Sequence, residues 1–255
     1  MTVITPFKAI RPTRDKAYLV ATRPFYAYNK EVLRAKLNHN PYTFLHVINP
    51  EFHTDDKTQP NTPERFQKIR NKFVEFINEG IFMQEEKESY YLYRQTVEGH
   101  EYVGLIAGAS VDQYNSGHIK KHEETITERE TVFSNYLKIV EFNVEPVLLF
   151  HRKHEALNQL LFPLMFARPE YEFTSWDRGK HEIWIVNDTE TIKKIQGYYS
   201  EIEDVYIADG HHRCASSARY SNSITDKTSK NQDLFLACFI SEEKLTGLVN
   251  SLSRT

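Results

Sequence analysis

The chain has 255 residues, of which 40% are hydrophobic and 13% aromatic, so it is long enough and apolar enough to bury a core. Its formal net charge of -3 gives no overall basic surface, which argues against a nucleic-acid-binding role. Neither G-x-G-x-x-G nor G-x-x-x-x-G-K-S/T occurs. The Rossmann fingerprint and the P-loop are therefore excluded, and a nucleotide site would have to be built from other parts.

Cysteine usage and the N-terminal sequence indicate the compartment. Cys214 and Cys238, the two cysteines of the chain, each stand beside apolar residues, so we interpret them as small core residues rather than a disulfide or metal framework. The N-terminus MTVITPFKAIRP lacks the apolar segment of a signal peptide, and no apolar run approaches membrane-spanning length. The sequence predicts a soluble, cytoplasmic protein without a membrane or nucleic-acid partner.

The first third of the chain combines short apolar runs closed by proline, which are typical of strands, with apolar spacings of three and four, which are typical of helices. In chain order, these patterns predict a strand at residues 3–11, a helix at 29–38, a strand at 44–48, a loop at 50–63 and a helix at 63–80. The last of these has the clearest amphipathic pattern, and we assign its aromatic stripe to the core.

The rest of the chain shows two hairpin patterns and more helices. Turn residues separate strands at 90–97 and 100–110, and again at 171–175 and 182–186. Three more helices and three more strands follow from the same patterns: helices at 129–139, 154–166 and 189–199, and strands at 144–150, 205–208 and 234–240. Pro146 makes the strand at 144–150 either an edge strand or one with an irregular start, and Pro163 should end or kink its helix.

Hairpins separated by helices predict an α+β fold, a mixed sheet with flanking helices, rather than a doubly wound parallel sheet. There is no internal repeat, low-complexity segment or long linker. We expect a single α+β domain over residues 1–240, with room for two subdomains, followed by a divergent or truncated tail at 241–255. Trp176 and Trp184 are expected to be packing residues.

The stretch VYIADGHHRCASSARY, residues 205–220, is the strongest candidate for a functional site. A short strand stops at Asp209-Gly210, and a helix begins at His211. The first backbone N–H groups of such a helix have no partners in the helix and attract anions, most often phosphate. A simple helix start needs only Asp209 as a cap, so His211, His212 and Arg213 are in excess of that need.

A second polar block, HIKKHEET, occupies residues 118–125. Such a block is usually a solvated charge run or an exposed helix start. Here its charges lie together beside a glycine turn. Lys120 and Lys121 can bind phosphates as point charges, and Glu123 beside them is a candidate general base.

Five blocks of the sequence together resemble a widespread prokaryotic family of uncharacterised proteins, domain of unknown function 1015. In chain order they are PFKAIRP, NPYTFLHVINP, YLYRQT, HIKKHEET and IADGHHR, and the resemblance covers residues 5–240. That family is similar to the free serine kinases and, more remotely, to the ParB and sulfiredoxin superfamily. The resemblance therefore implies a ParB/sulfiredoxin-like, free-serine-kinase-like core, with Lys8 and Arg11 near the site.

The chain departs from these relatives in three places. Tyr26 is followed by Ala27 where relatives have Tyr-Asp, and His211 stands where sulfiredoxin-like relatives carry a cysteine, so thiol-based sulfinic repair is not expected. Relatives also continue well beyond the point at which the likeness fades, near Ser241.

The leading hypothesis is a nucleotide-binding phosphotransferase. The resemblance implies ATP or ADP as the donor, Mg²⁺, and a small hydroxy amino acid as the acceptor. Phosphoryl transfer needs cationic groups on the phosphates and a group that orients or deprotonates the acceptor. The residues predicted for these roles are Glu123, Asp209, His211 and His212 in catalysis; Lys120, Lys121, Gly210, His211 and Arg213 in phosphate or nucleotide binding; and Arg11 and His122 in substrate binding.

Two alternatives remain open. One is a nucleotide-responsive binding module like ParB, which would need a basic surface or an attached DNA-binding motif. The other is a metal-dependent hydrolase, for which the sequence offers the ligand types His and Asp. Its candidate ligands are His118, His122, Asp209, His211 and His212. Adjacent histidines in the first turn of a helix rarely reach one metal ion together.

Overall fold

The computed structural model describes residues 1–176 and 178–244, which divide into two compact units. Unit 1 consists of Met1–Lys8, Glu86–Ser134 and the described residues from Asn143 onward. Unit 2 consists of Ala9–Glu85 and Asn135–Phe142, so helix α6 (Thr127–Val140) contributes residues to both units. In the sequence, unit 2 is inserted after the first strand of unit 1.

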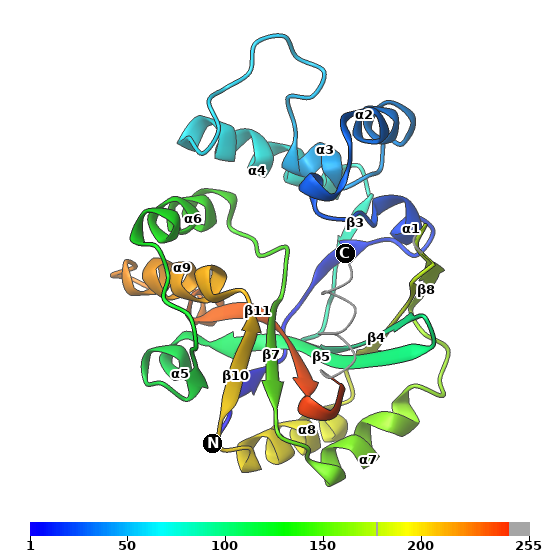
Figure 1. Ribbon diagram of the computed structural model, residues 1–255, viewed down its shortest axis with the longest axis vertical. Helices are drawn as coiled ribbons and strands as arrows, with labels where there is room; N and C mark the ends of the chain where they lie inside the picture. The colour runs from blue at the N-terminus through cyan, green and yellow to red at the C-terminus, as the bar shows by residue number, and fades with distance from the viewer. Residues whose placement is uncertain (177, 245–255) are drawn as a thin grey trace. The chain divides into compact units, whose positions relative to one another are not determined.

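Unit 1 is built on a mixed β-sheet (Figure 1). Among the described residues the sheet has nine strands, in the order β6-β10-β7-β11-β5-β4-β9-β8, with β1 paired to β5. β7 runs parallel to β11 and antiparallel to β10. The strands are β1 (Ile4–Thr5), β4 (Tyr90–Val97), β5 (His100–Ser110), β6 (Ile119–Lys120), β7 (Val147–His151), β8 (Tyr171–Thr174), β9 (Lys180–Val186), β10 (Val205–Asp209) and β11 (Leu234–Ser241).

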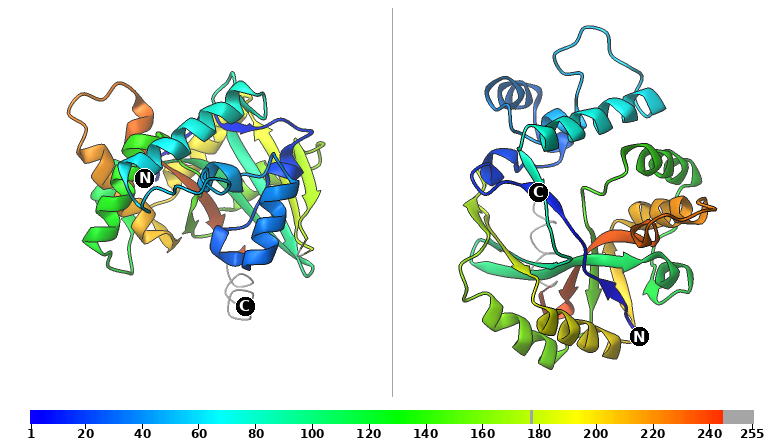
Figure 2. Two further views of the ribbon diagram at one scale, coloured as in Figure 1. Left: turned by 90° about the horizontal axis from the view of Figure 1, so that it is seen from above. Right: turned by 180° about the vertical axis from the view of Figure 1, so that it is seen from behind.

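Two pairs of helices pack on this sheet. Figures 1 and 2 show α5 beside α9, and α7 beside α8. Phe235, near the start of β11, packs edge-on against Tyr114 of α5 with ring centroids 6.5 Å apart. Phe239, near the end of the same strand, packs against Tyr199 of α8 at 5.4 Å. Because residues 235 and 239 share one face of a strand, the helix pairs cover the same face at opposite ends. The helices are α5 (Val111–Asn115), α7 (Glu155–Leu164), α8 (Thr189–Glu201) and α9 (His211–Asn222).

The predicted α+β class, a mixed sheet with flanking helices, is confirmed. Both hairpins are present; the turn between β4 and β5 places Glu98 and Gly99 at φ 50° and 81°, in the left-handed region that such turns need. The turn of the second hairpin includes Asp177, which lies outside the described residues. β7 begins one residue after Pro146 in the interior of the sheet, so the strand has an irregular start and is not an edge strand.

Three sequence predictions are corrected by the structure. Residues 44–48, predicted as a strand, contain the short helix α3 (Leu45–Ile48), because a short, mainly apolar run fits one helical turn as well as a strand. The single strand predicted at 3–11 is two strands, β1 in unit 1 and β2 (Ile10–Pro12) in unit 2. Trp184 is buried as expected, but Trp176 is 64% exposed and is not a core residue.

Unit 2 is mainly helical. Its longest helix, α4, follows the predicted pattern: Thr62 accepts a hydrogen bond from the Arg65 N–H as the cap, Pro63 opens the first turn, and Gly80 follows the end at φ 67°. The elements of this unit are β2 (Ile10–Pro12), α1 (Ala17–Val20), the 3₁₀ helix Phe25–Ala27, α2 (Lys30–His39), α3 (Leu45–Ile48), α4 (Pro63–Asn78) and β3 (Phe82–Gln84).

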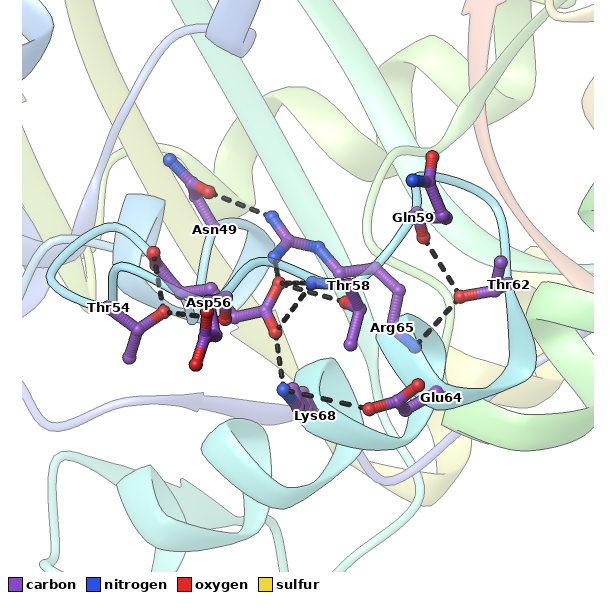
Figure 3. Close-up of polar contacts among 10 residues, drawn as sticks. Asn49, Thr54, Asp56, Thr58, Gln59, Thr62, Glu64, Arg65 and Lys68 are labelled. Atoms are coloured by element: carbon purple, nitrogen blue, oxygen red, sulfur yellow. Dashed lines mark hydrogen bonds and ion pairs between the residues drawn. The ribbon is translucent and has the colours of Figure 1, made fainter.

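A buried carboxylate, that of Glu51, holds the loop before α4 in place. In the sequence this loop is only a polar, proline-bearing stretch. The Glu51 side chain is 3% exposed and receives ion pairs from Arg65 and Lys68. The Thr58 hydroxyl also donates to Glu51 at 2.9 Å, while Arg65 donates to the Asn49 side chain at 2.9 Å (Figure 3). These donors, that of Lys68 foremost, lower the pKa of Glu51 to about 2. Because the polar groups of this cluster bind one another, we interpret the cluster as structural.

Two sequence predictions concern the end of the chain and the membrane. Of the tail predicted at 241–255, residues 245–255 lie outside the described residues, and Ser241 completes β11. In the part of the chain that the structure describes, no helix has the length and apolar character needed to cross a membrane.

Candidate functional site

Gly210 forms the junction between β10 and α9 in a conformation that favours glycine. Its φ of 99° lies in the left-handed region. A Cβ at this position would lie 2.7 Å from Cγ1 of Val147, so any side chain would clash. The Cys214 N–H donates to the Gly210 carbonyl at 3.0 Å, and the amides of residues 211–213 precede this first helical bond. The predicted helix start at His211 is therefore present, and its binding of an anion stays a prediction.

His211 connects the two polar blocks that the sequence singled out. Its side chain is 5% exposed, and the His122 N–H donates to its Nε2 at 3.4 Å. Since a backbone N–H can only donate, the neutral ring carries its proton on Nδ1, which lies 3.6 Å from the Glu123 carboxylate. Burial first, and then the neighbouring His122, lower the pKa of His211. The result is a buried neutral imidazole directed at an exposed carboxylate.

Arg213 is held by groups of the protein itself. Nη1 donates to the Pro146 carbonyl at 2.9 Å and lies 3.4 Å from the Glu145 carboxylate, and Nη2 forms an ion pair with Asp209. The sequence predicts a guanidinium free to hold phosphate in a bidentate manner. In the structure, most of its donors instead fasten α9 to the strand ends of β10 and β7, so a phosphate would have to compete with carboxylates.

The two lysines of the second block go to different places. Lys121 lies over the ring of Tyr114, with Nζ 3.7 Å from the ring centroid, close to His122 and Glu123 in the chain. Lys120 pairs with Asp204 at 3.1 Å, before the first residue of β10. Asp204 and the helix start are separated by the five residues of β10, or about 16 Å. Lys120 is therefore not brought to the helix start, and the geometry gives its predicted phosphate-binding role no support.

His212 is half-buried, and its ring nitrogen Nδ1 is one of the buried polar atoms that have no hydrogen-bond partner among the described residues. A buried ring nitrogen without a partner costs stability unless a ligand or water supplies one. An ordinary helix start does not explain this buried ring nitrogen without a partner.

The residues of the second block also line an open pocket of about 570 Å³ in front of Glu123. Its floor is Tyr114, which is 6% exposed and whose pKa burial raises to about 12, so the phenol stays neutral. The pocket is lined by Tyr114, Lys121, His122, Glu123, Glu124 and Thr125. It has room for a small polar molecule within reach of the Glu123 carboxylate.

Sequence reasoning missed four residues of this region. Tyr114 forms the pocket floor, Glu145 and the Pro146 carbonyl bind Arg213, and Glu130 of α6 bonds with Thr125 and lies 3.5 Å from Arg219. The contacts of Arg213 with residues 145 and 146 span more than sixty positions in the chain, so no local pattern reveals them. A motif search around residue 209 could not have found them.

Two further predictions concern residues outside this group. Arg11 belongs to unit 2, where its Nε pairs with the Glu85 carboxylate. As for metals, no three His, Cys, Asp or Glu side chains within residues 1–176 and 178–244 are grouped so that they could hold one ion. The five candidate ligands of the hydrolase alternative therefore do not form a common metal site.

The fold and the site define an α+β protein with a charged site where a strand of a mixed sheet leads through glycine into a helix. The model of one family, described as Protein of unknown function (DUF1015), matches residues 4–248. The chain belongs to this family. No curated protein and no solved structure matches the chain.

Proposed function

We propose that this site binds the phosphates of ATP or ADP and transfers a phosphoryl group to the hydroxyl of a small molecule. The observation that carries the proposal is the pairing of the open start of α9 with the buried His211 and the exposed Glu123, 3.6 Å apart. The two blocks lie almost ninety residues apart in the sequence, yet they meet at one place. An anion site beside an oriented carboxylate is the minimum that phosphoryl transfer requires.

Each group has a role in this proposal. The amides of residues 211–213 and Lys121 hold phosphate oxygens. Glu123 takes the proton of the acceptor hydroxyl while the hydroxyl oxygen attacks phosphorus. The bond from phosphorus to the leaving nucleotide oxygen breaks. His211 is a positioning residue, because its Nδ1 proton orients the carboxylate while its Nε2 is held by the His122 N–H.

The surplus of carboxylates around α9 makes Mg²⁺ a requirement of this proposal. Asp209, Glu145 and Glu123 would repel a polyphosphate, and Arg213 is already bound by two of them. Asp209, with 71% of its side chain exposed, is the residue that would hold Mg²⁺ together with phosphate oxygens. When bound, the ion neutralises phosphate charge.

The nature of the acceptor and the deeper fold relationship rest on resemblance. The likeness to free serine kinases supports free serine, a small hydroxy amino acid, as the first acceptor to test, and the pocket in front of Glu123 has room for it. The same likeness supports a ParB/sulfiredoxin-like core for the sheet of unit 1.

The experiment follows phosphoryl transfer by ³¹P NMR, with the purified protein, ATP or ADP, Mg²⁺ and free serine. Glu123→Gln should lower turnover by about 100-fold or more, because a general base contributes that much, while nucleotide binding persists. Glu128→Gln, the same change at an exposed position at the start of α6, serves as the control and should leave turnover unchanged. Equal turnover in both variants, or no nucleotide binding with Mg²⁺, would overturn the proposal.

A further inference from the structure

A second pocket lies at the other end of the central strands, between the carboxyl ends of β7 and β11 and the helices α7 and α8. Its volume is about 510 Å³, in the range of pockets that hold small organic ligands. His151 is the last residue of β7 and Ser241 the last of β11, and the two are direct partners in the parallel pairing. Side chains of such partners stand next to each other on one face of the sheet. None of the motifs in the sequence includes either residue.

Two polar groups at this pocket have unused hydrogen-bonding capacity. His151, 2% exposed, donates from Nδ1 to the Arg152 carbonyl at 2.8 Å, so its neutral ring has its lone pair on Nε2. Ser241 is 9% exposed, and its hydroxyl has no hydrogen-bond partner in the described part of the chain. The Tyr199 side chain is 1% exposed, and its ring packs edge-on against His151 at 5.4 Å. Unpaired groups of this kind are rare in a folded interior.

Charged and polar side chains also line the pocket, and the other lining residues are apolar. Phe239 and Leu105 come from the sheet, Leu157 and Leu161 come from α7, and Met165 directly follows α7. This combination of an apolar wall with a few converging polar groups is the usual composition of a small-molecule site.

The charged side chains that line the pocket are all exposed and are of both signs: Glu101, Lys153, Glu155, Glu243 and Lys244. Lys153 at its rim lies 3.1 Å from both the Glu155 and the Glu243 carboxylates. Burial lowers the pKa of His151 and raises that of Tyr199, so both side chains are neutral near pH 7. Beside His151 and Tyr199, a charged ligand group would lose its hydration without gaining an opposite charge from either side chain.

We propose that this pocket binds an uncharged molecule made of an apolar ring or chain with one hydroxyl or N–H group, which donates a hydrogen bond to Nε2 of His151. The Tyr199 ring packs edge-on against the same imidazole. The site is independent of the phosphotransferase proposal, because it shares no residue with the start of α9.

The test compares three probes with one naphthalene ring on the wild-type chain: 2-naphthol, 2-methoxynaphthalene and 2-naphthoate. Binding is followed by the ¹⁵N shift of His151 Nε2 in histidine-labelled protein and by fluorescence. We expect 2-naphthol to bind saturably and to move this resonance. 2-Methoxynaphthalene, which lacks the donor, should bind about tenfold more weakly, the value of one hydrogen bond. 2-Naphthoate should bind the weakest, because it is an anion.

A pair of variants locates the binding. Asn158→Trp places a large side chain in the pocket from α7 and should abolish 2-naphthol binding. Lys193→Trp adds the same side chain at an exposed position of α8 outside the pocket and should leave binding unchanged. The proposal is overturned if 2-naphthol does not bind, if the methoxy compound or the anion binds equally well or better, or if both variants bind alike. The probe comparison uses the wild-type chain and does not depend on the folding of a variant.

Discussion

The central strands of unit 1 have a functional candidate at each end, and the two differ in chemistry. At the start of α9 the polar groups are mostly charged and exposed: the side chains of Asp209 and Glu123 are 71% and 60% exposed. At the pocket beside α7 the polar groups of Tyr199 and His151 are uncharged and buried, at 1% and 2% exposure. β7 serves both ends, because Pro146 precedes it at one and His151 completes it at the other.

The difference shows what kind of ligand each end can hold. Charges in contact with water are weak alone but attract an ion that brings its own countercharge. Buried neutral groups instead select a ligand by the hydrogen bonds that it can complete, since a mismatch leaves a polar group without a partner. One sheet can therefore present an ionic site and a neutral site about five strand residues, or about 16 Å, apart.

The largest effect on stability is expected at Gly210, where the α9 end depends on backbone geometry. Gly210→Ala forces a Cβ to within 2.7 Å of Val147 Cγ1 at a φ of 99°, and should lower the free energy of unfolding by about 1 to 3 kcal/mol. Urea denaturation measures this. Gly197→Ala in α8, where a Cβ meets nothing within 4 Å, should instead stabilise by about 0.5 to 1 kcal/mol. Equal effects at the two glycines would show that the junction is not constrained.

Two buried serines distinguish a satisfied group from one without a partner. Ser216, in α9, donates to the His212 carbonyl at 2.6 Å, so Ser216→Ala should lower the free energy of unfolding by about 1 kcal/mol. Ser241→Ala removes a buried hydroxyl that has no partner in the described chain, and should raise the free energy of unfolding by about 1 kcal/mol. Both variants are compared by the midpoint of urea unfolding. A loss of stability in Ser241→Ala would mean that this hydroxyl is already bonded, and would weaken the pocket proposal.

A pH titration compares the two ends through their histidines. Burial lowers the pKa of both His151 and His211 below the ordinary value of about 6.5. As pH falls below about 6.5, the unfolded chain takes up protons that the native chain does not, so stability decreases. Above about pH 7.5 neither histidine makes the free energy of unfolding depend on pH. His151→Gln and His211→Gln should each reduce the slope of unfolding free energy against pH in this window. An unchanged slope in either variant would show that its histidine is not buried as a neutral ring.

The ease of prediction from sequence also separates the two ends. Asp209 to Arg213 are contiguous, and the period of the flanking strand and helix is local information, so the junction could be predicted from the residues. The meeting of His211 with Glu123 follows from the pairing of β6 with β10, and only the resemblance placed these blocks in one site. His151, Tyr199 and Ser241 come from three separate elements and carry no shared pattern, so the second pocket could not be predicted.

The fold shows the same boundary between local and long-range information. The β4–β5 hairpin and α4 were predicted because turn residues, caps and apolar period agree within one segment. The division of residues 3–11 between two units was not, because the strand partners of β1 and β2, β5 and β3, lie far along the chain. The ion pair of Lys120 with Asp204 could not be predicted for a related reason: it is set by the register of β6 against β10, which two strand residues do not specify.

The smallest expected effect is on the reaction rates of the two thiols, Cys214 and Cys238. Burial raises the pKa of both Cys214 and Cys238 to about 12, so almost no thiolate exists at neutral pH. Native protein should therefore react slowly with iodoacetamide at both thiols, as measured by peptide mass spectrometry, whereas urea-unfolded protein should react faster at both. Cys214 in the first turn of α9 is buried and Cys238 of β11 is half-buried, so Cys238 should react the faster in native protein. ATP with Mg²⁺ should slow Cys214 more than Cys238, because a ligand on the amides of residues 211–213 holds that turn closed. Equal slowing of both thiols would mean that the nucleotide binds elsewhere and stabilises the chain as a whole.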